Sequence, residues 1–184
     1  GILCDCALDL QGPKVTPSDF QRNIDFVELW NGKSPLIQPI IGPHAPDTLS
    51  EPRIRELVRY AHQKHLPLHF HLAQTMEESD CIIEKYHKTP TQFAFDAGLL
   101  GPRSLAAHAI YVTNNDLQIL KETQTSIAFC PSSAIVFAQL PPLLKFQQYG
   151  LNILLATDCV ASSDHLSMLR EMGTALTFIK HTRP

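Results

Sequence analysis

Apolar residues in this chain occur alternately in short runs and at helical spacing, which predicts strands that are each followed by a helix. The clearest run covers residues 66–75, where apolar side chains take every second position after a proline near the start. Two polar residues of this run, His69 and His71, therefore share the opposite face of the predicted strand. In the first predicted helix, Thr16 is a typical N-cap, and apolar residues then recur at helical spacing as far as position 30.

The same criteria predict six strands, and seven helical segments between and after them. The strands are expected at residues 1–10, 35–42, 66–75, 104–111, 126–130 and 151–158. The helices are expected at residues 16–30, 50–61, 81–86, 91–97, 115–121, 143–149 and 166–179. The stretches 11–15 and 131–140 are expected to be loops. A strict strand-then-helix order with apolar strands predicts an α/β fold with a parallel sheet that is buried on both faces.

Both a doubly wound sheet and a (β/α)₈ TIM-type barrel have this order of elements. Ionisable and polar residues at the carboxyl ends of several strands favour the barrel, because barrel enzymes collect their functional groups there. Six β/α units are two short of a closed barrel. We therefore expect residues 1–184 to form a single domain that is an internal piece of a longer chain, with the first two strands absent.

Composition narrows the possible functions. With 44% hydrophobic residues, the chain can bury a core without disulfide bonds, and its five cysteines fit neither a disulfide framework nor paired zinc spacing. Reduced thiols are typical of a cytoplasmic protein, and we expect Cys159 to be buried. A net charge of -3 with scattered basic residues argues against nucleic-acid binding. No apolar stretch approaches the roughly 20 residues that span a bilayer, so no membrane partner is expected.

The predicted strand ends carry a set of candidate metal ligands. His44, His71 and His108 stand at or near the ends of three successive strands, Cys130 ends the next, and Asp158 ends the last. Neutral imidazoles with a carboxylate suit a divalent metal such as zinc, which lowers the pKa of a bound water toward neutrality. Each residue alone is equally compatible with ordinary hydrogen bonding. Together, on one rim of a barrel, they predict a metal site.

Several other polar residues are expected to have no role in the site. We expect the remaining histidines on helices and loops to be at the surface. They are His62, His65, His87, His165 and His181. The acidic residues Glu77, Glu78 and Asp80 are interpreted as a solvated helix start that interacts favourably with the helix dipole.

Four segments, in order and spacing, resemble the amidohydrolase superfamily, and above all its methylthioadenosine/S-adenosylhomocysteine deaminase and triazine chlorohydrolase branch. They are Gly-Pro-His-Ala-Pro at 42–46, His-Leu-Ala-Gln-Thr at 71–75, Ala-His at 107–108 and Thr-Asp at 157–158. The resemblance covers nearly the whole chain and implies the third to eighth strands of a barrel. It implies a metal-dependent hydrolase that deaminates or dechlorinates an aromatic heterocycle, such as a purine nucleoside or a triazine. Pairing into homodimers is frequent in the family.

The resemblance also implies a role for each site residue. His71 would be the metal ligand of the fifth strand, and Asp158 would be both the ligand of the eighth strand and a proton acceptor. His108 would bind the metal or its water and help catalysis, and His44 would contact the substrate. Zinc is the expected ion, with iron as the alternative. Gln74 would be both a substrate-binding and a catalytic residue.

The chain departs from the family pattern in three ways. The first-strand His-x-His pair is absent. The pair His69 and His71 could be mistaken for it, but two strand-helix units precede it and only three strands follow, so we expect His69 to pack deeper in the barrel. Gln74 stands where the family has a proton-shuttling glutamate, which leaves open an impaired or non-catalytic heterocycle-binding relative. Phe-Cys-Pro at 129–131 replaces a His-Asn-Pro phrase. A scaffold without activity of its own is the third alternative.

Overall fold

The computed structural model describes residues 1–9, 17–137 and 140–182, and in this part of the chain strands alternate with helices. The strands are β1 (Ile2–Leu3), β2 (Cys6–Ala7), β3 (Gln38–Pro39), β4 (Gly42–Pro43), β5 (Leu68–Leu72), β6 (Ser104–His108), β7 (Ser126–Phe129) and β8 (Ile153–Leu155). The helices are α1 (Pro17–Trp30), α2 (Glu51–Lys64), α3 (Met76–Tyr86), α4 (Pro90–Asp96), α5 (Asn114–Glu122), α6 (Pro131–Val136), α7 (Leu143–Tyr149), α8 (Val160–Ser163) and α9 (Met168–Thr182).

All described strand pairs are parallel, as the order of elements predicts. β1 pairs with β3, and β2 pairs with β4. The four strands from β5 to β8 pair with one another in sequence order. A bridge between Ile41 and Leu68 connects the two groups. The carboxyl ends of all these strands therefore lie along one edge of the sheet, which places residues that follow different strands close together.

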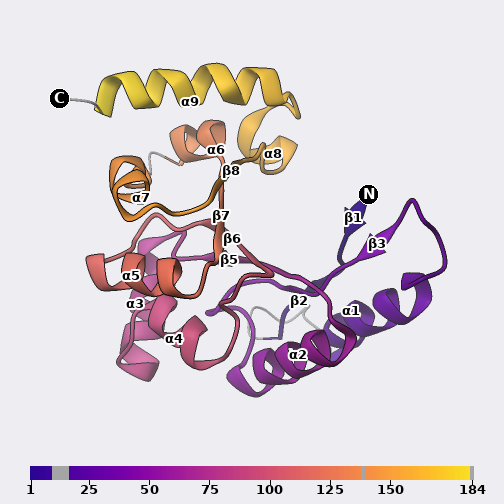
Figure 1. Cartoon of the computed structure of the whole chain (residues 1–184). Coiled ribbons are helices and arrows are strands. Elements are labelled where there is room, and N and C mark those ends of the chain that lie inside the picture. The colour runs from indigo at the N-terminus through magenta and orange to yellow at the C-terminus, as the bar shows by residue number, and fades with distance from the viewer. Residues whose placement is uncertain (10–16, 138–139, 183–184) are drawn as a thin grey trace.

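The central strand β5 shows the alternation that its sequence predicts. Leu68, Phe70 and Leu72 are buried in the main core, while His69 and His71 are half-buried on the other face. The main core also contains apolar residues of α2, α4 and α5, which pack against the sheet. Figure 1 shows α2, α3, α4 and α5 together on one side of the strands, with α9 at the opposite end of the molecule. One face of β5 thus anchors the strand, and the other presents its histidines.

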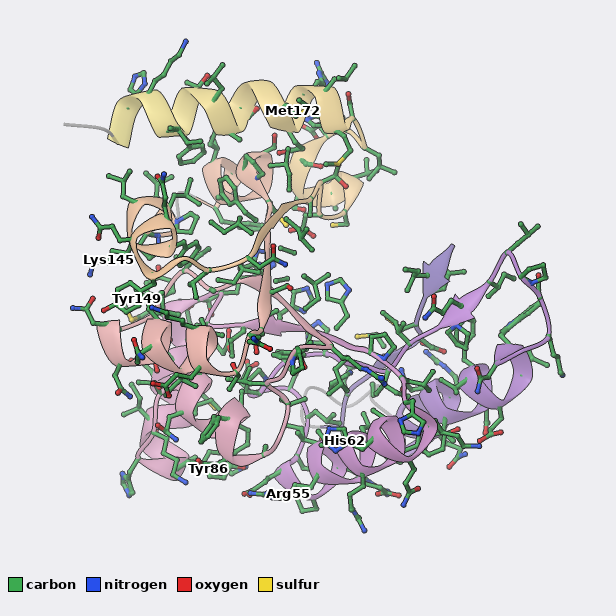
Figure 2. The ribbon with its side chains drawn as sticks, viewed as in Figure 1. Arg55, His62, Tyr86, Lys145, Tyr149 and Met172 are labelled. Carbon is green, nitrogen blue, oxygen red and sulfur yellow. The ribbon has the colours of Figure 1, made fainter. Side chains whose placement is uncertain are left out.

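The helices cover the outside of the sheet. The side chains labelled in Figure 2 belong to these helices, with Arg55 and His62 on α2, Tyr86 on α3 and Met172 on α9. Lys145 on α7 donates a hydrogen bond to Asn114 at the start of α5, at 3.0 Å. Within the described residues, no helix is both long and apolar enough to cross a membrane.

Several predicted elements differ in extent from those observed. The predicted strand at 1–10 is divided into the two short strands β1 and β2, and the one at 35–42 into β3 and β4. The predicted strand at 151–158 is hydrogen-bonded only over β8. Position 10, the predicted loop 11–15 and the predicted cap Thr16 lie outside the described residues. The last helix, α9, begins and ends two to three residues later than the prediction of 166–179.

Two predictions about helices were wrong. The stretch 131–140 is not simply a loop, because α6 begins at Pro131, directly after β7. A proline at the first helical position loses no hydrogen bond there, so a helix can start without a further turn. The helix predicted at 81–86 begins earlier, at Met76, because the Thr75 side chain caps it by accepting the N–H of Glu78.

Candidate functional site

The strand ends place the predicted ligands around one cavity of about 410 Å³. His71 lies in β5, His108 ends β6, Cys130 directly follows β7, and Asp158 lies three residues beyond β8. All four residues line the cavity. The parallel topology thus brings together the three residues that were predicted as metal ligands, together with the cysteine.

The histidines form a row at the edge of the sheet. The rings of His71 and His108 are stacked, with centroids 5.4 Å apart and an interplanar angle of 14°. The His44 ring lies edge-on to His71 at 4.8 Å. Nδ1 of His71 lies 3.0 Å from the main-chain oxygen of His44, so this nitrogen carries the proton and donates it to the carbonyl. The other nitrogen, Nε2, then holds the lone pair that a metal requires.

His108, Cys130 and Asp158 form a close group of possible ligands in the described residues. One ligand atom from each lies within 4.8 Å of the other two. Burial raises the pKa of the Cys130 thiol to about 12, and nearby carboxylates add to the effect. The sequence contained one signal for this residue, its position at the end of a strand, but the resemblance pointed only to the histidines and the aspartate.

Two hydrogen bonds orient Asp158. The Ser133 hydroxyl donates to Oδ2 at 2.6 Å, and the main-chain N–H of Cys159 donates to Oδ1 at 2.7 Å. Burial by itself would raise the pKa of Asp158, but the hydrogen bonds from Ser133 and Cys159, with smaller contributions from His108 and Ser162, together hold the pKa below its ordinary value. Sequence reasoning missed Ser133, because only the unexpected helix α6 turns this residue toward Asp158.

The donor set fits a divalent metal ion. Burial, reinforced by the nearby His71, lowers the pKa of His44 and of His108 to about 4. Both imidazoles are therefore neutral near pH 7, while Asp158 is ionised. Neutral imidazoles and a carboxylate are what zinc and similar ions accept, and a thiol can join them by losing its proton.

The backbone is held in an unusual conformation at this edge. His108, Ala109 and Asp158 have φ of 76°, 51° and 60°, and Ala73, after β5, has φ of 49°. L-residues other than glycine rarely adopt this left-handed region, and such strain gathers where a site imposes it. The strand ends are thus built to direct particular side chains.

The other predicted residues occupy different positions. His44 hydrogen-bonds through Nδ1 to Thr48 at 2.7 Å and lines a smaller neighbouring cavity of about 130 Å³. His69 lines both cavities, as His71 does, and stands two residues earlier in β5, so it faces the same interior. Gln74 is half-buried beyond the end of β5, and it does not line the larger cavity.

Three expectations about burial were wrong. Cys159 is exposed, because it begins the short turn into α8 and has no core to enter. Glu78 is 3% exposed and accepts main-chain hydrogen bonds, so it is not part of a solvated helix start. His165 is half-buried, with Nε2 3.6 Å from Oε1 of the fully buried Glu171. The other four histidines predicted at the surface, His62, His65, His87 and His181, are exposed.

Acidification is expected to destabilise the metal-free protein through His44. Its folded-state pKa of about 4 lies below the ordinary 6.5, so between these values the unfolded chain binds more protons and the free energy of unfolding falls as the pH falls. Glu78, whose pKa burial raises to about 7, contributes with the opposite sign. The readout is therefore a difference between variants. In urea unfolding with a chelator present, H44N should lose less stability on acidification than the wild type, whereas H62N should match the wild type. Equal pH dependence of H44N and wild type would contradict the expectation.

Comparison with known proteins identifies the family of this chain. Residues 5–182 match the amidohydrolase family. The chain is 31% identical to a 5-methylthioadenosine/S-adenosylhomocysteine deaminase of Caldanaerobacter subterraneus over 98% of the chain and 42% of the relative. An adenosine deaminase structure from Xanthomonas campestris with bound zinc superposes with a TM-score of 0.87 at 26% identity, over 96% of this chain and 41% of that one.

A more distant structure has the same fold. Atrazine chlorohydrolase from Arthrobacter aurescens, complexed with zinc, superposes with a TM-score of 0.73 at 17% identity, over 80% of this chain and 33% of that one. The parallel sheet and its helices are thus part of a (β/α)₈ barrel, as predicted, and the chain spans less than half the length of the relatives it matches. This chain belongs to the amidohydrolase family.

Proposed function

We propose that residues 1–184 form one unit of a metal-dependent hydrolase that removes an amino group from an aromatic heterocycle. The observation that carries the proposal is the convergence of His71, His108 and Asp158 on one cavity at the carboxyl edge of the sheet. The deaminases among the relatives support a C–N bond as the target. A purine nucleoside is the substrate class that these names favour, and removal of chloride from a triazine is the alternative.

The proposed metal ligands are His71, His108 and Asp158, and zinc is favoured over iron because two similar structures contain it. A bound ion of this kind makes a water molecule a good nucleophile at neutral pH. Nδ1 of His71 is fixed by the carbonyl of His44, so Nε2 is the ligand atom. Asp158 is held ionised by Ser133 and Cys159 and can accept a proton from the attacking water.

The remaining roles concern the substrate. His44 is neutral and its ring lies against that of His71. It can therefore donate a hydrogen bond to a heterocycle nitrogen or its substituent, or accept one from it. Gln74 lies two residues beyond the end of β5, the strand that carries His71, and its amide can both donate and accept hydrogen bonds. We propose both as substrate-binding residues, and His108 as the group that polarises the bond under attack.

A second candidate is a relative that binds a heterocycle without turning it over efficiently. Gln74 is the observation that favours it, because an amide cannot exchange a proton at neutral pH. A carboxyl group at this position would provide general acid–base catalysis worth about 10² to 10⁴ in rate. Q74E separates the two candidates, because it restores a carboxyl group at this position.

Metal analysis combined with a substrate panel on the full-length protein tests the proposal. We expect stoichiometric metal, and ammonia release from at least one purine or chloride release from a triazine. H71A should lose both metal and turnover, whereas H62A, altered on the exposed face of α2, should retain both. A wild-type protein without metal, together with an H71A variant of unchanged activity, would refute the proposal.

A further inference from the structure

Glu78 is a buried carboxylate that the proposed reaction does not use. It is 3% exposed and is the third residue of α3. An acid at this position of a helix ordinarily accepts the N–H of the N-cap residue. Asp116 does so in α5, where its carboxylate accepts the N–H of Thr113 at 2.8 Å. The Glu78 side chain instead extends past the N-cap residue Thr75 to main-chain groups that precede it in the sequence.

The two carboxylate oxygens of Glu78 hold the turn that follows β5. Oε1 accepts the N–H of Ala73 at 2.8 Å, and Oε2 accepts the N–H of Gln74 at 2.7 Å. Ala73 is the left-handed residue of this turn, two positions after His71. A single carboxylate thus stabilises an unfavourable backbone conformation directly beside a proposed metal ligand and a proposed substrate-binding residue.

The same turn is bonded to the turn that follows β6. The oxygen of Ala73 accepts the N–H groups of Ile110 at 3.0 Å and of Tyr111 at 2.9 Å, and the oxygen of Leu72 accepts the N–H of Ala109 at 2.9 Å. His108 and Ala109, both left-handed, lie in this second turn. The carboxylate therefore acts on the ends of two strands, those that carry His71 and His108.

We propose that Glu78 is a positioning residue that sets the geometry of His71, Gln74 and His108 by holding the turns after β5 and β6. The role in catalysis rests on the proposed function, whereas the role in holding the turns does not. A helix cap alone would not need this arrangement, because Thr75 already accepts the N–H of Glu78. Burial, with Asp47 nearby, also disfavours the ionised carboxylate, so a purely structural position would be better filled by a neutral residue.

The variant E78D separates the two roles. Aspartate is one methylene shorter, so it can accept the N–H of the N-cap residue, as Asp116 does, but it cannot reach both Ala73 and Gln74. E78Q keeps the length but offers one acceptor oxygen in place of two. D116N is the matched control, because it weakens an equally buried helix cap whose carboxylate accepts hydrogen bonds from Thr89 and Thr113 and not the N–H groups of Ala73 and Gln74.

Hydrogen exchange of the metal-free protein is the first measurement. E78D and E78Q should exchange the amides of Ala73, Gln74 and Ala109 at least about tenfold faster than wild type, the equivalent of one hydrogen bond to a charged group. D116N should leave the amides of Ala73 and Gln74 unchanged even if it lowers the melting temperature. Unchanged exchange in E78D and E78Q, or equal acceleration in D116N, would overturn the proposal.

Metal affinity and steady-state kinetics are the second measurement. Both Glu78 variants should bind zinc about 10- to 100-fold more weakly. They should lower kcat by a larger factor than they raise KM, because the ligands are misplaced while the substrate pocket persists. Weakened zinc binding in both variants together with wild-type exchange rates would also count against the role. If the wild type binds no metal, the proposed function fails, and the exchange rates still decide whether Glu78 holds the turns.

Discussion

Q74E is expected to raise the rate of purine deamination by about 10² to 10⁴, if the protein is an impaired member of its family. The family resemblance places a glutamate here, and a carboxyl group can pass a proton between the attacking water and a ring nitrogen. An amide can only hold the substrate by hydrogen bonds. The measurement is kcat/KM for ammonia release across a purine and triazine panel, in wild type and Q74E.

The surroundings of Gln74 favour a carboxyl group of suitable pKa. Its main-chain N–H donates to the buried carboxyl group of Glu78, so a second carboxyl group would titrate close to another acid and in a half-buried position. Both effects raise a carboxyl pKa toward neutrality, which suits a proton shuttle. Q63E, on the exposed face of α2, is the matched control and should leave all rates unchanged.

A fall in activity of Q74E would have a different meaning. It would show that the amide at position 74 is matched to a substrate that needs a neutral hydrogen-bonding partner, and the idea of impairment would be abandoned. An unchanged rate on every substrate would remove Gln74 from the site altogether. Each result therefore assigns the residue a different role.

The sequence predicted the fold well where its pattern was strong. In β5 the alternation of apolar residues with His69 and His71 fixes which face is buried, because a strand has a period of two. Parallel order then places the ends of β5, β6 and β8 on one edge, so His71, His108 and Asp158 could be expected to meet. Strand lengths were overestimated, because an apolar run does not indicate where the hydrogen-bonded ladder ends.

What the sequence did not predict depends on tertiary contacts. Glu78 has the charge of a surface residue, and only the turn after β5 provides two N–H groups that compensate its burial. Glu171 is likewise fully buried, where it accepts the N–H of Ser132 at 3.0 Å. Both partners are main-chain groups that carry no signature in the sequence. Buried acids of this kind are therefore recognised only in the structure.

D158N is expected to remove most of the turnover, by a factor of about 10² to 10⁴ or more, and to weaken metal binding. Asparagine has nearly the same shape, but it cannot accept a proton and it carries no charge to attract a cation. It can keep both neighbours, because its Oδ1 can accept the N–H of Cys159 while its NH₂ group donates to the hydroxyl oxygen of Ser133. The measurements are metal content and kcat/KM.

D164N is the matched control for this variant. Asp164 is exposed, lies in the same segment after β8, and is left-handed with φ of 56°, a conformation that asparagine tolerates. Its metal content and activity should equal those of the wild type. If D158N retained both as well, Asp158 would be neither ligand nor proton acceptor, and the hydrogen bonds from Ser133 and Cys159 would then serve only to hold the turn between β8 and α8.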